Sequence, residues 1–388
     1  MNPGRPLRFR SYGIGGAIAA AALGAQMTVT LATAGTWMIV PSPNPPGSLA
    51  TLASVSCPDA MTCFAVGDAF SHGKDHPLVE RWDGTAWAVV PTPDLSLLGS
   101  LGAVSCVSSR SCMAVGSSFR PTGGLARTFT ARWDGASWSR IASPTPGQGA
   151  SLTGVSCVNT SLCAAVGESI SASGAQRTLV ERWNGSTWSV IASPNPSGAG
   201  SWLSSVSCSA ASACFAVGER EPSQQTGRTL VEQWSGKSWT IVPSPNVSSS
   251  SVSRLYDVAC TAPNDCAAVG WYLGALGSTT LTETWDGTSW RIVPSANVSG
   301  DGSLFSVSCA SPSDCVAVGA YARSAGVNAT LIERWQGTAW AVVRHPNPTL
   351  SKGSGLFGID CRDPATCVAV GDNAPTVSTE STLVEQRQ

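Results

Sequence analysis

Two of the chain's three histidines lie beside two aspartates near the start of the sequence. The segment 68–76 reads Asp-Ala-Phe-Ser-His-Gly-Lys-Asp-His, so Asp68, His72, Asp75 and His76 could offer nitrogen and oxygen ligands. Imidazole and carboxylate groups together bind zinc and other transition metals. One flexible segment rich in Gly and Ser is a poor preformed cage, however. We therefore expect a solvated polar loop here, with no metal ion and no other cofactor.

A second group combines aromatic rings with charges: Arg254, Tyr256, Asp257, Trp271 and Tyr272, with Trp202 about fifty residues earlier. Corresponding segments elsewhere carry mostly small residues, apart from Phe305 and Phe357 at the position of Tyr256. Rings beside an arginine or a carboxylate suit sugar binding. Asp257 could also act as a general acid or base. The alternative is that these side chains only fill the interior, which is our interpretation of the two phenylalanines.

No complete catalytic constellation accompanies these residues. The sequence has no G-x-S-x-G motif, which would mark one common type of nucleophilic serine. Further carboxylates, Asp360, Glu168, Glu219 and Glu221, could pair for hydrolytic or lyase chemistry, but nothing in their spacing specifies it. Binding is therefore favoured over catalysis.

The fourteen cysteines form seven C-x5-C pairs: Cys57–Cys63, Cys106–Cys112, Cys157–Cys163, Cys208–Cys214, Cys260–Cys266, Cys309–Cys315 and Cys361–Cys367. This spacing suits the two ends of a hairpin turn, where facing residues lie about 5 Å apart. A zinc site would normally show shorter spacing and histidine partners. We predict seven disulfides, and hence an oxidising compartment.

The first cysteines recur every 49 to 52 residues, and each repeat reads as four short strands. In one repeat these are 152–157, 163–167, 178–183 and 188–191, with Asn184-Gly185 as a tight turn. A period of this length with four strands is typical of the blades of a β-propeller. The predicted fold is all-β, a seven-bladed propeller with four strands and one disulfide in each blade.

The two ends of the chain complete each other. The seventh repeat stops after its third strand at Arg387, and the segment Trp37–Pro45 matches the fourth strand and link at Trp188–Pro196. The strand 36–41 should therefore complete the last blade and close the ring. The propeller spans 35–388, with blades at about 51–91, 100–142, 151–192, 202–243, 254–294, 303–343 and 355–388.

Two further residue types repeat from blade to blade. Twelve of the fifteen tryptophans form W-x-G-x-x-W pairs, which we interpret as packing between blades. A glutamate recurs in the third strand at Glu80, Glu181, Glu232, Glu283, Glu333 and Glu385, with Ala131 in the second blade. We expect each glutamate to be solvated or paired with a local arginine such as Arg182.

The order of these elements resembles the kelch repeat of galactose-oxidase-like propellers. It is also similar to exported, cysteine-paired propeller repeats of actinobacteria. The match lies in the second strand ending in Gly167, a variable loop, and V-E-R-W followed by a Gly turn and a second Trp. A single glycine replaces the kelch double glycine, and the cysteines are additional. The resemblance implies a propeller, and copper chemistry of the galactose-oxidase type is not expected because the tyrosines are few and the cysteines paired.

Residues 1–34 have the pattern of a signal peptide. Arg5, Arg8 and Arg10 precede an uncharged Ala/Gly-rich stretch that ends at Ala32-Thr33-Ala34. We expect cleavage after Ala34 and secretion from a bacterial cell. An uncleaved segment would instead be an N-terminal membrane anchor.

The net charge of −1 does not favour binding to the phosphates of nucleic acid, so we expect no nucleic-acid partner. After cleavage we expect the protein to be a monomer without membrane contact.

The loops between second and third strands vary most and share one face. They are 68–77, 117–127, 168–177, 219–229, 271–280, 320–329 and 372–381. We call this face the loop face. The expected function is a secreted, non-enzymatic scaffold that binds an extracellular glycan or protein. The alternative is a secreted carbohydrate-active enzyme, a hydrolase or lyase, with its site on this face.

Overall fold

The computed structural model describes most of the chain after residue 34. The described residues are 35–92, 98–120, 123–223, 226–247, 252–275, 277–296, 298, 301–324, 327–348, 353–376 and 379–387. Residues 1–34, the predicted signal peptide, lie outside these ranges. Within the described ranges the regular structure is entirely β-strand, and no helix is present that is long and apolar enough to cross a membrane.

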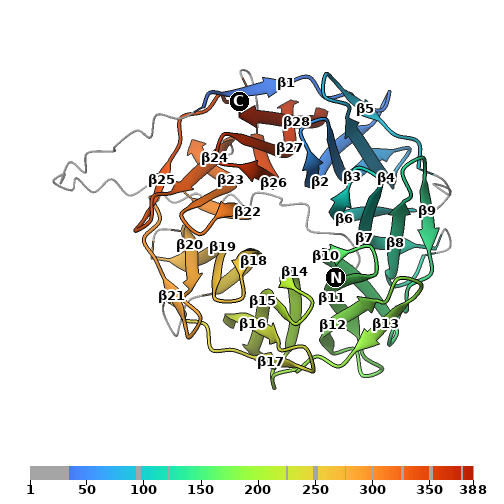
Figure 1. Cartoon of the computed structure of the whole chain (residues 1–388), viewed down its shortest axis with the longest axis vertical. Helices are drawn as coiled ribbons and strands as arrows, with labels where there is room; N and C mark the ends of the chain where they lie inside the picture. The colour runs from blue at the N-terminus through green and yellow to red at the C-terminus, as the bar shows by residue number, and fades with distance from the viewer. Residues whose placement is uncertain are drawn as a thin grey trace.

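The strands form seven four-stranded antiparallel sheets arranged as a ring (Figure 1). The innermost strands are β2 (Leu49–Asp59), β6 (Leu98–Ser108), β10 (Gly149–Asn159), β14 (Gly200–Ala210), β18 (Ser253–Ala262), β22 (Gly302–Ser311) and β26 (Gly353–Asp363). The second strands are β3 (Thr62–Ser71), β7 (Ser111–Phe119), β11 (Leu162–Ile170), β15 (Ala213–Ser223), β19 (Asp265–Gly274), β23 (Asp314–Ser324) and β27 (Thr366–Thr376).

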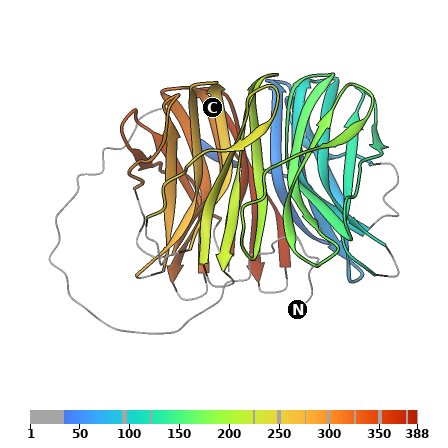
Figure 2. The same ribbon diagram turned by 90° about the horizontal axis from the view of Figure 1, so that it is seen from below.

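The third strands are β4 (Lys74–Trp82), β8 (Arg127–Trp133), β12 (Gln176–Trp183), β16 (Thr226–Trp234), β20 (Gly277–Trp285), β24 (Val327–Trp335) and β28 (Thr379–Arg387). The outermost strands are β5 (Trp87–Val89), β9 (Trp138–Ile141), β13 (Trp188–Ile191), β17 (Trp239–Ile241), β21 (Trp290–Ile292), β25 (Trp340–Val342) and β1 (Trp37–Val40). Blades 1 to 7 are numbered in the order of their innermost strands. Figure 2 shows the ring from the side, with the turns gathered at its two faces.

The last blade has the order β26-β27-β28-β1, so strands from both ends of the chain close the ring. Trp37 faces Arg387, and Val40 faces Val384. Arg387 stands where the other blades have the first tryptophan of the pair. Its Nη1 donates to the Pro364 carbonyl at 2.5 Å. In blade 3 the equivalent hydrogen bond is donated by Trp183 Nε1 to the Thr160 carbonyl at 3.2 Å. The predicted closure is confirmed.

All seven predicted disulfides are present, with Cα–Cα distances of 4.0 to 4.1 Å. Each joins the first two strands of a blade across the short turn, where Cys157, for example, faces Cys163. The Asn184-Gly185 turn also forms as predicted. Asn184 Oδ1 accepts from Thr187 N at 2.9 Å, and Gly185 has a φ of 96°, which a side chain would oppose.

Each of the seven apolar clusters lies between two neighbouring blades. In one of them, Met113 and Val115 of blade 2 pack with Trp183 and Trp188 of blade 3. These two rings are tilted at a centroid distance of 5.7 Å, and both are almost fully buried. The tryptophan pairs therefore pack between blades, as predicted.

The expectation that the repeated glutamates are solvated or paired with local arginines is wrong. All six are fully buried, and each contacts a residue of the link that leaves the preceding blade. The pairs are Ser42–Glu80, Ser143–Glu181, Ser193–Glu232, Ser244–Glu283, Ser295–Glu333 and His345–Glu385. Burial raises the pKa of Glu80, Glu181 and Glu333 to about 7 and of Glu232 and Glu283 to about 8, partly opposed by the serine hydroxyls. A carboxyl group without a cation is buried more cheaply when protonated.

A second ring of hydrogen bonds joins the innermost strands. The residue immediately before the first cysteine accepts a hydrogen bond from the backbone N–H of the first cysteine in the next blade. Five junctions use a serine: Ser56–Cys106, Ser105–Cys157, Ser156–Cys208, Ser207–Cys260 and Ser308–Cys361. Asp360 does the same for Cys57 at the closing junction, at 2.6 Å. Only Ala259 of blade 5 has no side-chain acceptor for this contact.

Candidate functional site

Four of the six predicted ligand-binding residues come together in blades 4 and 5. Trp202 lies on β14, Arg254 and Tyr256 on β18, and Trp271 on β19, all towards the loop face. The register explains their proximity, because Trp202 faces Glu219 of β15 and Arg254 faces Trp271. These five residues, Trp202, Glu219, Arg254, Tyr256 and Trp271, are called the arginine–aromatic cluster below.

Arg254 is at the centre of the cluster. Its guanidinium carbon lies 5.2 Å from the ring centroid of Trp202, 5.9 Å from that of Trp271 and 6.0 Å from that of Tyr256. Arg254 also forms an ion pair with Glu219, and Trp271 Nε1 donates to Tyr256 Oη at 2.9 Å. A cation over several ring faces holds those rings in place. The cluster is therefore organised before any ligand arrives.

The charges of the cluster are largely satisfied within it. Burial raises the pKa of Glu219 to about 7, against the lowering effect of Arg254, and burial also raises the pKa of the Tyr256 hydroxyl. The Arg254 side chain keeps 18% of its surface exposed, and Trp202, Tyr256 and Trp271 are half-buried. A ligand would meet ring surfaces and hydrogen-bonding groups here, with little uncompensated charge.

Asp257 lies next to Tyr256 in sequence but belongs to a different environment. Its carboxylate accepts from Ser205 Oγ at 2.5 Å, from Ser306 Oγ at 2.7 Å and from Val307 N at 2.8 Å. Burial raises the pKa of this carboxyl. Asp257 thus links blade 5 to blades 4 and 6.

Tyr272 also points away from the cluster. It follows Trp271 on β19 and so lies on the opposite face of the sheet. There it packs against the apolar cluster between blades 4 and 5, whose members include Leu255 and Val258. The structure therefore separates the two aromatic residues that the sequence places together.

An irregularity in the innermost strands brings further rings to the cluster. Each of these strands has a register shift that skips one residue, between Leu255 and Asp257 in blade 5 for example. The skipped residues, which we call the bulge residues, are Ala53, Gly102, Thr153, Ser204, Tyr256, Phe305 and Phe357. The ring of Phe305 lies 5.5 Å from those of Tyr256 and of Phe357, between centroids. We call Tyr256, Phe305 and Phe357 the aromatic arc. The sequence could have predicted this arc, because the three residues occupy the same position in three consecutive repeats.

The segment 68–76, which we expected to be a solvated polar loop, is a hairpin. β3 and β4 are joined by a two-residue turn at His72-Gly73, where φ is 50° and 78°. His76 faces Ala69, whereas Asp68 and Asp75 lie on the other side of the hairpin, facing Pro77 and Phe70. Among the described residues no three His, Cys, Asp or Glu side chains form a group that could hold a metal ion.

A pair of acidic residues in blade 7, not singled out from the sequence, also lies at the loop face. Asp372 of β27 and Glu380 of β28 are hydrogen-bonded, and burial together with this contact raises the pKa of Asp372 well above its usual range. Thr51 of blade 1 donates to Glu380 Oε1 at 2.8 Å. Two carboxyl groups this close share a proton.

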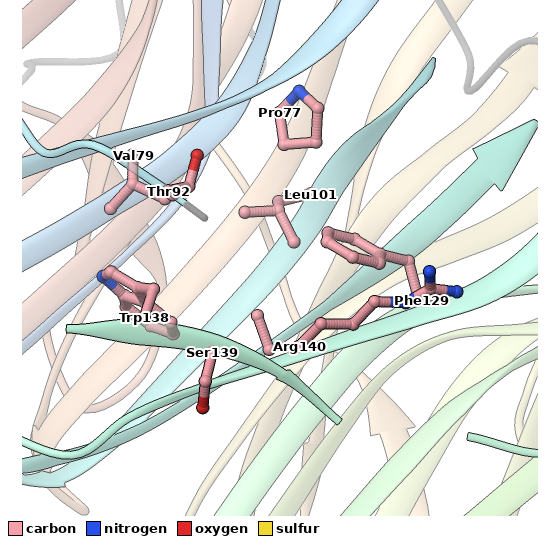
Figure 3. Close-up of a pocket in the computed structure, with 9 residues that line it drawn as sticks. Pro77, Val79, Thr92, Leu101, Phe129, Trp138, Ser139 and Arg140 are labelled. Atoms are coloured by element: carbon pink, nitrogen blue, oxygen red, sulfur yellow. The ribbon is translucent and has the colours of Figure 1, made fainter. Parts of the chain in front are cut away.

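Blade 2 contains a small apolar pocket where its third strand has Ala131 in place of the glutamate (Figure 3). Phe129, Trp138 and Arg140 line it, together with Thr92 of the preceding link. Thr92 Oγ1 is buried and has no hydrogen-bond partner among the described residues. The equivalent link residue Ser193 contacts Glu232. The pocket therefore lies where the glutamate side chain of the other blades would be.

No protein-family model matches the sequence, and no curated protein matches it. Solved structures match its fold. The structure of YCF48 bound to D1 peptide is 15% identical with a TM-score of 0.55, covering 92% of this chain and 96% of that one. YCF48 from Cyanidioschyzon merolae is 14% identical with a TM-score of 0.55, covering 91% and 99%.

A third match is a GH74 xyloglucanase from Xanthomonas campestris. It is 15% identical with a TM-score of 0.55, and the match covers 88% of this chain but only 54% of the xyloglucanase. At these identities the likeness establishes the propeller fold alone. The matched structures include one with a bound peptide and one enzyme, which is consistent with one fold serving different functions.

Proposed function

We propose that the protein is a secreted, non-enzymatic propeller that binds an extracellular glycan or protein through the arginine–aromatic cluster on its loop face. The observation that carries this proposal is the placement of Arg254 among the rings of Trp202, Tyr256 and Trp271. Binding energy concentrates on Trp, Tyr and Arg side chains that are held in position before the partner arrives.

The difference between blades supports this location. At the positions of Trp202 and Arg254 the other blades carry Thr51, Ser100, Ser151, Ser303 and Gly355. The repeat folds with small residues at these positions, so the fold itself does not require large ones. Large aromatic and charged groups confined to two neighbouring blades are what a localised binding site needs.

The contacts of the nearby carboxyl groups favour binding over catalysis. Asp257 accepts hydrogen bonds from two neighbouring blades, and Glu219 is paired with Arg254. The alternative of a secreted hydrolase or lyase would need carboxyl groups that reach the substrate. The carboxyl groups of Asp257 and Glu219 are both engaged in contacts within the protein.

Secretion is supported by the disulfides. Seven disulfides with no free cysteine are typical of an oxidising compartment, and the sequence 1–34 would direct export. The monomeric state and the absence of membrane contact after cleavage remain predictions.

The test is a retention experiment with the exported protein on immobilised neutral and acidic polysaccharides and on purified cell-surface proteins, with product release measured in parallel. We expect retention without products, weakened in Trp202→Ala and Trp271→Ala. The matched control is Ser151→Ala, which changes the position of Trp202 in blade 3. Released products, or retention that all three variants share with the unmodified protein, would overturn the proposal.

A further inference from the structure

The aromatic arc extends the arginine–aromatic cluster across three consecutive blades. Tyr256 belongs to both, and Phe305 and Phe357 continue from it into blades 6 and 7. All three rings are half-buried. The bulge residues of blades 1 to 4 are Ala53, Gly102, Thr153 and Ser204, and Thr153 is exposed to solvent. The inner wall of the propeller is thus aromatic on one side and small or polar on the other.

Blades 6 and 7 carry no aromatic or arginine side chain at the paired positions equivalent to Arg254 and Trp271, on the loop-face side of Phe305 and Phe357. Where blades 4 and 5 have the paired residues Trp202–Glu219 and Arg254–Trp271, blade 6 has Ser303–Ala320 and blade 7 has Gly355 facing Asp372. A Cβ atom at Gly355 would lie 2.9 Å from Phe357 Cζ, so this ring rests against the glycine. Gly355 and Ala320 therefore place no large side chain between these rings and the loop face.

Hydrogen-bonding groups flank the aromatic arc at both ends. The guanidinium of Arg254 and the hydroxyl of Tyr256 lie at one end, and the carboxyl groups of Asp372 and Glu380 lie in blade 7 at the other. The Arg254 charge is balanced by Glu219, and the acidic pair shares a hydrogen bond. The surface thus combines ring faces with hydrogen-bond donors and acceptors, and its cation, Arg254, is already paired.

We propose that the ligand is an uncharged glycan chain, laid over the aromatic arc from Trp202 and Trp271 to Phe357. This inference rests on the proposed function and narrows its ligand. The C–H faces of neutral sugar rings pack against aromatic side chains, and their hydroxyls both donate and accept hydrogen bonds. A polyanionic glycan would face the carboxyl groups of Glu219, Asp372 and Glu380, and a polycation would face Arg254.

The experiment is calorimetric titration of the exported protein with cellohexaose, xylohexaose, chitohexaose and a galacturonic acid hexamer. We expect one of the three neutral oligomers to bind and the acidic one not to bind. Phe357→Leu and Trp271→Ala should each weaken binding about tenfold, which corresponds to about 1.4 kcal/mol. Thr153→Ala, at the position of Phe357 in blade 3, is the matched control and should bind like the unmodified protein.

A second variant guards against loss of folding in Phe357→Leu. Ala320→Arg places a long side chain where blades 4 and 5 already hold Glu219 and Trp271, so the fold should accept it, and we expect it to abolish binding. The protein could instead bind the acidic hexamer or a purified protein, with binding weakened in Trp271→Ala but unchanged in Phe357→Leu and Ala320→Arg. That result would overturn this inference and leave the proposed function standing. Binding that is unchanged in Trp271→Ala would overturn both. Failure of all three neutral oligomers to bind would overturn the inference.

Discussion

The Ser193 hydroxyl lies 2.8 Å from Glu232 Oε2, although Ser193 follows the last strand of blade 3 and Glu232 belongs to the third strand of blade 4. The same hydroxyl contacts the hydroxyl of Thr178 in its own blade at 2.8 Å. The buried carboxyl group of one blade is thus connected to its neighbour through a link outside both sheets. Four of the other junctions use the same serine–glutamate contact.

Stability should fall as pH rises through neutrality. Burial raises the pKa of Glu232 to about 8, whereas a glutamate in the unfolded chain ionises near 4.5. Between these values the folded state holds a proton that the unfolded state has lost, so the free energy of unfolding decreases from about pH 4.5 to about pH 8. Chemical unfolding at a series of pH values should show this decline. Glu232→Gln, which mimics the protonated form, should reduce its slope, and an unchanged slope would contradict the burial of a neutral carboxyl group.

Removing the serine should destabilise the fold. Ser193→Ala leaves the Glu232 carboxyl without its partner from the link, and an unsatisfied buried polar group costs about 1–3 kcal/mol. Ser189→Ala is the control, because Ser189 is exposed on the outermost strand of the same blade. Equal unfolding free energies for the two variants would show that the contact between blades contributes nothing.

Filling the blade 2 pocket should stabilise the protein. Ala131→Glu supplies the side chain that six blades already have and gives Thr92 Oγ1 a partner, so we expect a gain of about 1 kcal/mol in the free energy of unfolding. The double variant with Thr92→Val tests the mechanism. If the hydrogen bond is responsible, the gain should shrink in that background. An undiminished gain would assign the effect to cavity filling alone.

The hydrogen bonds between innermost strands predict that adding a serine at one junction stabilises the fold and that removing one at another junction destabilises it. Ala259→Ser would give the junction between blades 5 and 6 the hydroxyl that five other junctions have, and should add about 1 kcal/mol to the free energy of unfolding. Ser156→Ala removes that hydroxyl from the junction of blades 3 and 4 and should cost a similar amount. Thermal unfolding of the two variants side by side provides the measurement. A shift of both in the same direction would contradict the prediction.

The fold could be predicted because the signals repeat. Seven Cys pairs at one spacing specify hairpins, and the fourth strand missing after Arg387 reappears at Trp37. Part of the site followed from the same logic. Arg254 and Trp271 sit at fixed positions in consecutive strands, so their pairing follows from the register of the blade.

What lies between blades could not be predicted from one repeat. Glu232 looked like a surface residue because carboxylates are rarely buried, and its partner Ser193 comes from another repeat. Tyr256 and Asp257 are adjacent in sequence and lie at the register shift that follows Leu255. Asp257 contacts blades 4 and 6, whereas Tyr256 belongs to the arginine–aromatic cluster. A bulge of this kind reverses the alternation on which sequence patterns depend.

The pairing of β1 with β28 has a consequence for how the protein is made. β1 is synthesised before any blade and its hydrogen-bonding partner after all the others, so the first strand to emerge must wait, unpaired, for the last. A chain that stops before Thr379 would leave β1 without a partner and the ring open. Completion of the outer edge of blade 7 therefore reports that the strands of all seven blades have been delivered to the compartment where the propeller folds.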